Sequence, residues 1–528
     1  MSEPSFQTKL PPFPPGYRAS GVLLHVTSLP SPYGIGDLGP QARNWIDCLQ
    51  EAGQTWWQIL PLGPTGYGSS PYQPQSSFAG NWLLVSPDDL IADGLLEKSD
   101  TAGYTFSETV VDYDTINAFK HTLLETAWIR FNKGDGHVLK ADFEQFCLAE
   151  QHWLDDYALF QALQEMHLGA SYLKWPAELV RRDPAALEQA RRGLSKEIDQ
   201  IRLAQFLFFR QASNLKNYAH SRGVRLIGDL PFFVSPDSSD VWAHPELFLL
   251  DEHLRPRFVA GVPPDYFSEQ GQLWGNPVYD WDVLRQSGYR WCIDRVRAIR
   301  THVDLIRLDH FRGFAAAWHV EAGAATALSG EWIPGPGNDF FSSVQQELGD
   351  LPFIAEDLGI ITPDVSTLRD QFQLPGTRVL QFAFDGAPDN PYLPHNYDSN
   401  TVVYTGTHDN NTTLGWYDTL TDNQRQIVCH YLQRSELNSS EATAALLELA
   451  WSSQAALAMA PLQDLLNLGE DARMNVPGSS EGNWRWRCTN EMLSPALFQS
   501  LRELTANSQR LPAFHPTLDS LPDSEVIS

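Results

Sequence analysis

Eight short apolar runs alternate with helical patterns along the chain, and this alternation predicts an α/β fold with a parallel sheet and right-handed crossovers. Eight strands are the number that closes a (β/α)8 TIM barrel. We therefore expect a barrel, and a doubly wound open sheet is the alternative. The runs lie near residues 20–29, 55–64, 224–233, 304–311, 352–359, 377–385, 401–410 and 472–478.

Amphipathic helices are recognisable between several of these runs. The helical pattern of residues 42–53 stops at Gly53, a residue type that readily takes the left-handed conformation at a helix end. Another helix has Thr362 in the N-cap position and Pro363 at its first turn. A third, over 290–300, places apolar residues on one stripe with arginines around it. These helices are the crossovers that a barrel requires.

Two insertions interrupt the spacing of the runs. About 160 residues separate the second run from the third, and their helical patterns predict an inserted, mainly helical subdomain over 64–222. Residues 232–288 are rich in Pro, Gly and aromatic residues, and a long ordered segment of this kind usually carries function, so we expect an inserted active-site loop region. The expected organisation is one catalytic barrel over 1–510 and a loose C-terminal tail over 511–528.

The composition indicates a globular protein that acts on a neutral partner. The 528 residues carry a net charge of −28, which argues against nucleic acid or an anionic membrane as a partner. The five cysteines have no CxxC spacing, so a reducing compartment is expected. The first residues lack a signal-peptide pattern and no apolar run is long enough to span a membrane, so we expect a soluble cytoplasmic protein.

The fourth run ends in a cluster of charge. Residues 304–313 begin as a buried strand and then add Arg307, Asp309 and His310. Residues two apart in a strand face the same side, so Arg307 and Asp309 should point together into the barrel. The guanidinium should lower the pKa of Asp309 and keep it ionised, as a nucleophilic carboxylate requires. The alternative is an ion pair that only ties the strand to its loop.

Acidic residues also follow other apolar runs. Asp229 ends the third run, Glu356 and Asp357 end the fifth, and His408 and Asp409 end the seventh. Each could be structural by itself, as a helix-start acidic pair or a hydrogen-bond bridge. Together they lie at the carboxyl ends of the strands, which is the face where α/β folds build active sites.

Several carboxylates that face one cleft fit two chemistries. One is metal binding, with His25, His310 and His408 as further ligands, although the sequence has no HxH pattern of the kind common in metal-dependent barrels. The other is sugar chemistry, which needs a carboxylate nucleophile and a second carboxyl that stays protonated until it is used. Asp309 suits the first role. Glu356 suits the second, because burial and nearby negative charge raise a carboxyl pKa.

Aromatic residues in the polar loops favour sugar chemistry. Tyr72 and Trp274 stand among Gly, Ser, Asn and Pro residues, where a flat apolar ring can meet the C–H face of a sugar. Packing in the core is the alternative role for such residues.

The motifs together resemble those of 4-α-glucanotransferases of the amylomaltase (disproportionating enzyme) family, glycoside hydrolase family 77 in the α-amylase clan. The matching stretches are "HVTSLPSPYGIGDLG", "PLGPTGYGSSPYQ", "GDLPFFVSPDSSDVW", "GVPPDYFSEQGQLWGNPVYDW", "IRLDHFRGF", "IAEDLG", "VLQFAF", "YTGTHDNNT", "RMNVPG" and "NWRWR". The chain departs from the usual family residues at Val26, Ala315 and Ala317.

This resemblance implies a retaining transfer of an α-1,4-glucan segment to the 4-hydroxyl of another glucan or glucose. It implies substrates that are α-1,4-glucans and maltooligosaccharides, a barrel without an amylase-like C-terminal β-domain, no metal or other cofactor, and a monomer or homodimer. It implies Asp309 as the nucleophile, Glu356 as the acid/base and Asp409 as the transition-state stabiliser. It implies substrate binding by Tyr72, Asp229, Tyr266, Trp274, Arg307, His310 and His408. A plain α-glucan hydrolase of the same clan, a glucan-binding protein with an idle site and a metal-dependent barrel hydrolase are the rival hypotheses.

Overall fold

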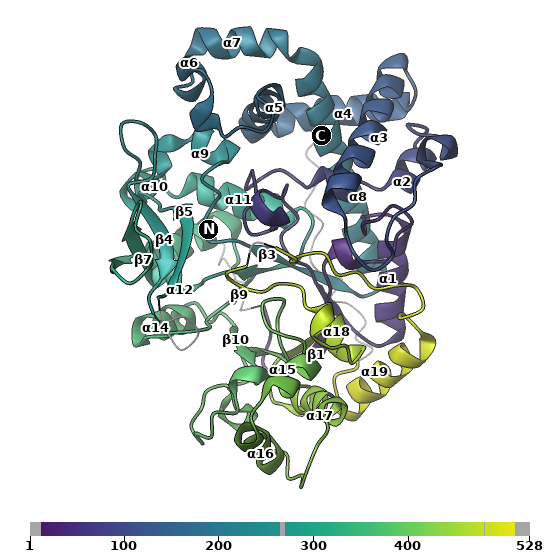
Figure 1. Ribbon diagram of the computed structural model, residues 1–528, viewed down its shortest axis with the longest axis vertical. Helices are drawn as coiled ribbons and strands as arrows, with labels where there is room; N and C mark the ends of the chain where they lie inside the picture. The colour runs from purple at the N-terminus through teal and green to yellow at the C-terminus, as the bar shows by residue number, and fades with distance from the viewer. Residues whose placement is uncertain (1–11, 265–269, 480, 513–528) are drawn as a thin grey trace, which may run out of the picture.

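The computed structural model describes residues 12–264, 270–479 and 481–512, and it contains a closed barrel of eight parallel strands (Figure 1). The order around the barrel is β1-β12-β11-β10-β9-β6-β3-β2. The strands are β1 (Ala19–Leu23), β2 (Trp56–Gln58), β3 (Arg225–Leu230), β6 (Leu305–Leu308), β9 (Phe353–Ala355), β10 (Gly376–Val379), β11 (Thr401–Tyr404) and β12 (Leu457–Pro461). The predicted (β/α)8 barrel is confirmed.

The eighth predicted run is wrong. Seven of the predicted runs contain barrel strands, but residues 472–478 follow a short helical turn and form a loop above the barrel. The eighth strand is β12, whose sequence LAMAP is completely buried. Alanine, leucine and methionine favour helices intrinsically, so only the pairing of β12 with β1 and β11 reveals it as a strand.

Helices surround the barrel at the places where helical patterns were predicted. Pro40 begins α1, and the chain turns at Gly53 with a φ of 71°. Thr362 precedes α14, although its hydroxyl accepts a hydrogen bond from Arg312 and not from the helix start. The helices after the barrel strands are α1 (Pro40–Glu51), α8 (Ser195–Ser221), α11 (Arg290–Arg300), α13 (Gly337–Leu348), α14 (Pro363–Gln371), α15 (Thr413–Thr419), α16 (Asp422–Tyr431), α17 (Ser439–Ser452), α18 (Leu462–Leu465) and α19 (Pro495–Asn507).

A group of helices fills the long stretch between β2 and β3, where the helical subdomain was expected. Figure 1 shows these helices together across the upper part of the molecule. Those that precede α8 are α2 (Pro87–Ala92), α3 (Tyr113–Lys133), α4 (Lys140–Ala149), α5 (Gln151–Met166), α6 (Ala177–Val180) and α7 (Pro184–Gly193). None of the helices in the described part of the chain combines the length and the apolar character that crossing a membrane requires.

A small antiparallel sheet, which the sequence did not predict, stands at one edge of the molecule (left in Figure 1). Its order is β5-β4-β7-β8, with β4 (Phe258–Val262), β5 (Gln272–Pro277), β7 (Ala316–Glu321) and β8 (Gly330–Pro334). The short helices α9 (Ser239–Ala243) and α10 (Trp281–Gln286) flank β4 and β5, and α12 (Arg312–Ala315) joins β6 to β7. The sheet combines strands from two stretches that are separate in the sequence, so no local sequence pattern predicts it.

The interior of the barrel changes from apolar to charged along the strands. Ile227 and Leu305 belong to the apolar cluster inside the barrel. Two residues further along, on the same face of β3 and β6, stand Asp229 and Arg307, which are partners in register. Asp309 follows where β6 ends. The predicted inward direction of Arg307 and Asp309 is therefore confirmed, and the core ends where the charged layer begins.

Arg510 joins the C-terminal part of the chain to the start of β1. Its side chain is 0% exposed, and it donates hydrogen bonds to the carbonyls of Ala19, Trp451, Ser453, Ala455 and Ala456. Arg18 shares two of these acceptors, the carbonyls of Trp451 and Ser453, so two guanidinium groups satisfy the buried carbonyls of this region.

We predict that Arg510→Leu lowers the free energy of unfolding by about 2–4 kcal/mol, because it removes the buried hydrogen bonds that this guanidinium donates, including the bond to the carbonyl of Ala455. Arg502→Leu on α19 is the matched control, since Arg502 makes a single exposed hydrogen bond to the carbonyl of Glu51. Urea denaturation followed by tryptophan fluorescence measures both. Equal stability of the two variants would contradict the stabilising role that we assign to the buried hydrogen bonds of Arg510.

Candidate active site

The carboxyl ends of the barrel strands open into a cleft of about 1250 Å³. The three acids predicted to be catalytic, Asp309, Glu356 and Asp409, all line this cleft. They come from the ends of β6, β9 and β11, three strands that are distant in sequence. The structure thus brings the predicted acids to one place.

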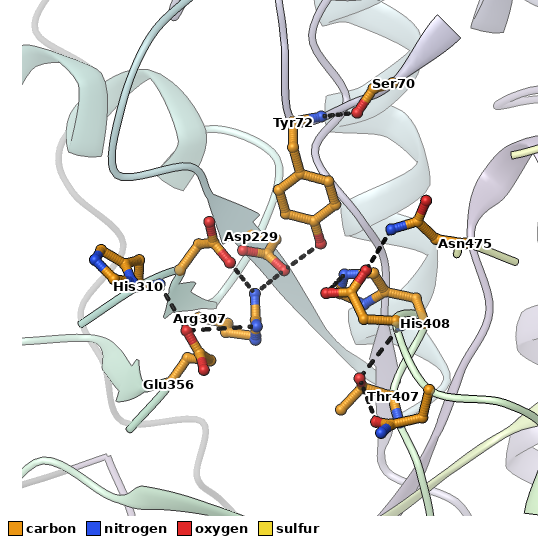
Figure 2. Close-up of polar contacts among 12 residues, drawn as sticks. Ser70, Tyr72, Asp229, Arg307, His310, Glu356, Thr407, His408 and Asn475 are labelled. Atoms are coloured by element: carbon orange, nitrogen blue, oxygen red, sulfur yellow. Dashed lines mark hydrogen bonds and ion pairs between the residues drawn. The ribbon is translucent and has the colours of Figure 1, made fainter. Parts of the chain in front are cut away.

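Arg307 lies at the centre of these acids on the floor of the cleft (Figure 2). Its Nη1 donates to Asp229 Oδ2 at 2.7 Å and to Asp309 Oδ1 at 3.0 Å. Its Nη2 lies 3.9 Å from Glu356 Oε2. The side chain is buried, so the cation has little water to solvate it and depends on these carboxylates. One guanidinium therefore sets the positions of three acidic side chains.

The backbone of His310 holds Glu356 in place. The amide N–H of His310 donates to Glu356 Oε2 at 2.7 Å. His310 has a φ of 49°, in the left-handed region that side chains other than glycine rarely adopt, at an energy of about 1–2 kcal/mol. This conformation turns the chain sharply after Asp309. Strained backbone at such a point is typical of functional sites.

Asp409 stands on the opposite wall of the cleft from Glu356. Asn475 Nδ2 donates to its Oδ1 at 2.6 Å, and His408 Nε2 lies 3.3 Å from its Oδ2. Tyr72 stacks on the His408 ring with centroids 5.0 Å apart, and its hydroxyl donates to Asp229 Oδ2 at 2.9 Å. Figure 2 shows His408 and Asn475, the partners of Asp409, on one side of Arg307 and Glu356 on the other.

The electrostatics of the two central acids differ from the sequence prediction in one respect. Burial raises the pKa of Asp309 to about 6, and the lowering effect of Arg307 does not outweigh it. The predicted net lowering is wrong, because the nearby charges of Asp229 and Asp409 also oppose ionisation. Burial and the negative charge of Asp309 raise the pKa of Glu356 to about 8, in the predicted direction. Asp309 is therefore the acid that ionises first.

Asp409 behaves in the opposite way. Burial opposes its ionisation, but the charge and hydrogen bonds of His408 and Asn475 bring the pKa of Asp409 well below its usual range. It is a permanent negative charge at the wall of the cleft. The site thus holds one fixed anion, Asp409, and two carboxyls, Asp309 and Glu356, whose pKa values lie at about 6 and about 8.

The structure places the remaining predicted residues as follows. Trp274, on β5, lines the cleft with its ring 4.8 Å from the His310 ring at 85°. Tyr266 lies outside the described residues. Asp357 does not line the cleft. It is buried in ion pairs with Arg369 and Arg378, so its role is structural.

Sequence reasoning missed the two polar residues of the cleft loop that hold Asp409. Arg473 donates to the backbone carbonyl of Asp409 at 2.8 Å, and Asn475 to its carboxylate. Both lie in residues 472–478, which had been interpreted as a strand. The motif "RMNVPG" contained the signal, because a charged residue and an amide before Pro-Gly are typical of a loop.

The histidines considered as metal ligands do not gather into a metal site. His25 and His408 line a small cavity that shares Thr407 and Arg473 with the cleft, and His310 lines the cleft itself. Over residues 12–264, 270–479 and 481–512, no group of three His, Cys, Asp or Glu side chains has an arrangement that could hold a metal ion.

We predict that Glu356→Gln stabilises the protein increasingly as the pH rises from about 4.5 to 8. The pKa of Glu356 is raised from 4.5 to about 8 by folding, so the unfolded chain ionises first and wild-type stability falls across this range. Glutamine removes the titration and still accepts from the His310 amide. Melting temperatures of both proteins from pH 4 to 9 provide the measurement. A constant difference between them would show that Glu356 titrates normally.

Comparisons with known proteins identify the family of this chain. A family model described as glycoside hydrolase 77, 4-alpha-glucanotransferase, matches residues 24–493. The chain is 47% identical over 499 residues to the 4-alpha-glucanotransferase of Thermus thermophilus, covering 94% of this chain and 99% of that protein. It is 43% identical to the chloroplastic/amyloplastic 4-alpha-glucanotransferase of Solanum tuberosum, covering 94% and 87%.

Among solved structures, the amylomaltase from Streptococcus agalactiae in complex with acarbose superposes with a TM-score of 0.90 at 38% identity, covering 94% of this chain and 100% of that one. The chain therefore belongs to glycoside hydrolase family 77, the family of 4-α-glucanotransferases.

Proposed function

We propose that this enzyme transfers a segment of an α-1,4-glucan or maltooligosaccharide to the 4-hydroxyl of another glucan or of glucose, by a retaining double displacement. The observation that carries the proposal is the contact of one buried guanidinium, Arg307, with both Asp309 and Glu356. Two carboxyls held on one cation at the floor of an open cleft are the pair that retaining glycoside chemistry requires. We expect their oxygens to lie about 5–5.5 Å apart when a sugar is bound.

In the first step Asp309 is the nucleophile. Its ionised carboxylate attacks the anomeric carbon, the bond to the glycosidic oxygen breaks, and a β-linked glycosyl ester forms. Glu356 gives its proton to the departing oxygen, so the leaving chain ends in a neutral 4-hydroxyl. The order of the two pKa values supports this division, because Asp309 loses its proton before Glu356 does.

In the second step an acceptor sugar takes the place of the leaving chain. Glu356, now ionised, removes the proton from the acceptor 4-hydroxyl as that oxygen attacks the anomeric carbon. The bond to Asp309 breaks and the α-linkage is restored, so the two inversions give net retention. Arg307 orients Asp309 and accommodates its changing charge through both steps.

The opposite wall holds the sugar whose bond is broken. Asp409, a fixed anion, binds ring hydroxyls and stabilises the positive charge that develops on this sugar in the transition state. Tyr72 offers a flat ring beneath the sugar, and Asp229 holds the tyrosine hydroxyl. His408 and His310 bind further hydroxyls, and Trp274 shields the Glu356 side from water, which favours transfer over hydrolysis.

The setting of the enzyme is also a proposal. All five cysteines are unpaired, which supports a reducing compartment such as the cytoplasm. The net charge of −28 supports an enzyme that works without nucleic acid or a membrane surface, as a monomer or homodimer. We propose one catalytic unit over 1–510 with the insertions 64–222 and 232–288.

We predict that maltotriose is converted to glucose and a ladder of longer maltooligosaccharides, with little rise in reducing ends. Asp309→Asn should reduce this conversion by roughly 10⁴-fold or more, because no ester can form. Asp389→Asn, a change at an exposed aspartate, is the control and should be fully active. Chromatography of the products measures both. A dominant rise in reducing ends would instead indicate a hydrolase, and an active Asp309→Asn variant would remove the nucleophile assignment.

A further inference from the structure

We propose that Arg312 and Trp332 form a separate glucosyl-binding subsite on the acceptor side of the cleft, beyond the first acceptor sugar. This inference rests on the proposed function. Both side chains line the same cleft as Asp309 and Glu356. Neither is needed for the two chemical steps, so their placement calls for a different role.

The two side chains form a rigid pair. The Arg312 guanidinium lies 3.8 Å from the centroid of the Trp332 ring, on β8. Trp318, the cross-strand neighbour of Trp332 on β7, packs against it with centroids 5.3 Å apart at 63°. The Trp318 indole N–H in turn donates to the carbonyl of Ala327 at 3.0 Å. The half-buried Trp332 ring is thus held in one orientation, as a stacking platform must be.

Arg312 retains hydrogen-bonding capacity within the cleft. It is 7% exposed, and its Nη1 donates to the carbonyl of Ile360 at 2.7 Å and to Thr362 Oγ1 at 2.9 Å. Within the described residues its Nη2 makes no hydrogen bond, and no carboxylate forms an ion pair with the guanidinium. The Nη2 group is therefore a donor without a protein acceptor, and a bound hydroxyl would supply one.

These features together suit a neutral sugar. A flat ring meets the C–H face of a glucosyl unit, and an adjacent N–H donor meets its hydroxyl groups. A phosphate or carboxylate ligand fits less well, since the same cleft carries Asp309, Glu356 and Asp409. The glucan that enters the cleft is therefore the ligand we assign.

The position of Glu356 identifies the acceptor side of the cleft. The acid/base lies beside the oxygen of the leaving and incoming chains, so its side is the acceptor side. Figure 2 shows His310 and Glu356 on one side of Arg307, with His408 and Asn475 on the other. Arg312 is bound to Ile360 and Thr362, in the segment that follows Glu356. It therefore extends the cleft on the acceptor side, outward from His310.

The test uses α-maltosyl fluoride as donor, because fluoride leaves the acceptor side open to the added sugar. Elongation of glucose, maltose and maltotriose is followed by chromatography. We expect Trp332→Ala to lower kcat/KM for maltotriose about five- to ten-fold and to leave glucose unchanged. Trp332→Phe should keep the preference for long acceptors. Trp332→Leu, which keeps apolar packing on Arg312 without a flat ring, should match Trp332→Ala.

An equal loss with glucose and maltotriose, or no loss with either, in Trp332→Ala and Trp332→Leu would overturn the subsite. Failure of the proposed function looks different: the wild-type enzyme would then elongate no acceptor at all.

Discussion

Arg307 carries a positive charge into the interior of a closed barrel, where the residue is only 4% exposed. A buried cation requires compensating negative charge. Asp229 on β3, Asp309 at the end of β6 and Glu356 after β9 supply it. The rest of the site follows from this requirement. Asp229 also holds the hydroxyl of Tyr72, so the guanidinium indirectly positions the sugar platform on the opposite wall.

The same arrangement separates the chemical roles of the acids. Burial raises the pKa of both Asp309 and Glu356, and Arg307 opposes the rise in each. Arg307 donates directly to Asp309 at 3.0 Å but lies 3.9 Å from Glu356, so the nucleophile has the closer cation. Asp409 stays ionised through His408 and Asn475, independently of this pair. Distance from one cation thus distinguishes Asp309 from Glu356, and separate partners distinguish Asp409 from both.

The sequence predicts this site well wherever an apolar run ends in charge, as at Asp309 and Glu356, because strand alternation and the strand-end rule are local. It fails where the structure depends on distant pairing. Strand β12 has a helix-favouring composition and becomes a strand only between β1 and β11, and the small sheet joins two insertions. The net pKa shift of Asp309 was mispredicted because adjacent residues reveal the cation but not the depth of burial. Trp332 gave no signal, since only the fold brings it to Arg312.

The central claim is that Asp309 forms a covalent glycosyl-enzyme while Glu356 supplies and removes the proton. Reaction of Glu356→Gln with α-maltosyl fluoride tests it most directly. Fluoride needs no acid to depart, and without the base the ester should persist long enough for peptide mass spectrometry. The account predicts one maltosyl unit on the peptide that contains Asp309. A maltosyl unit on another residue, or consumption of the fluoride with no adduct at any time after mixing, would contradict it.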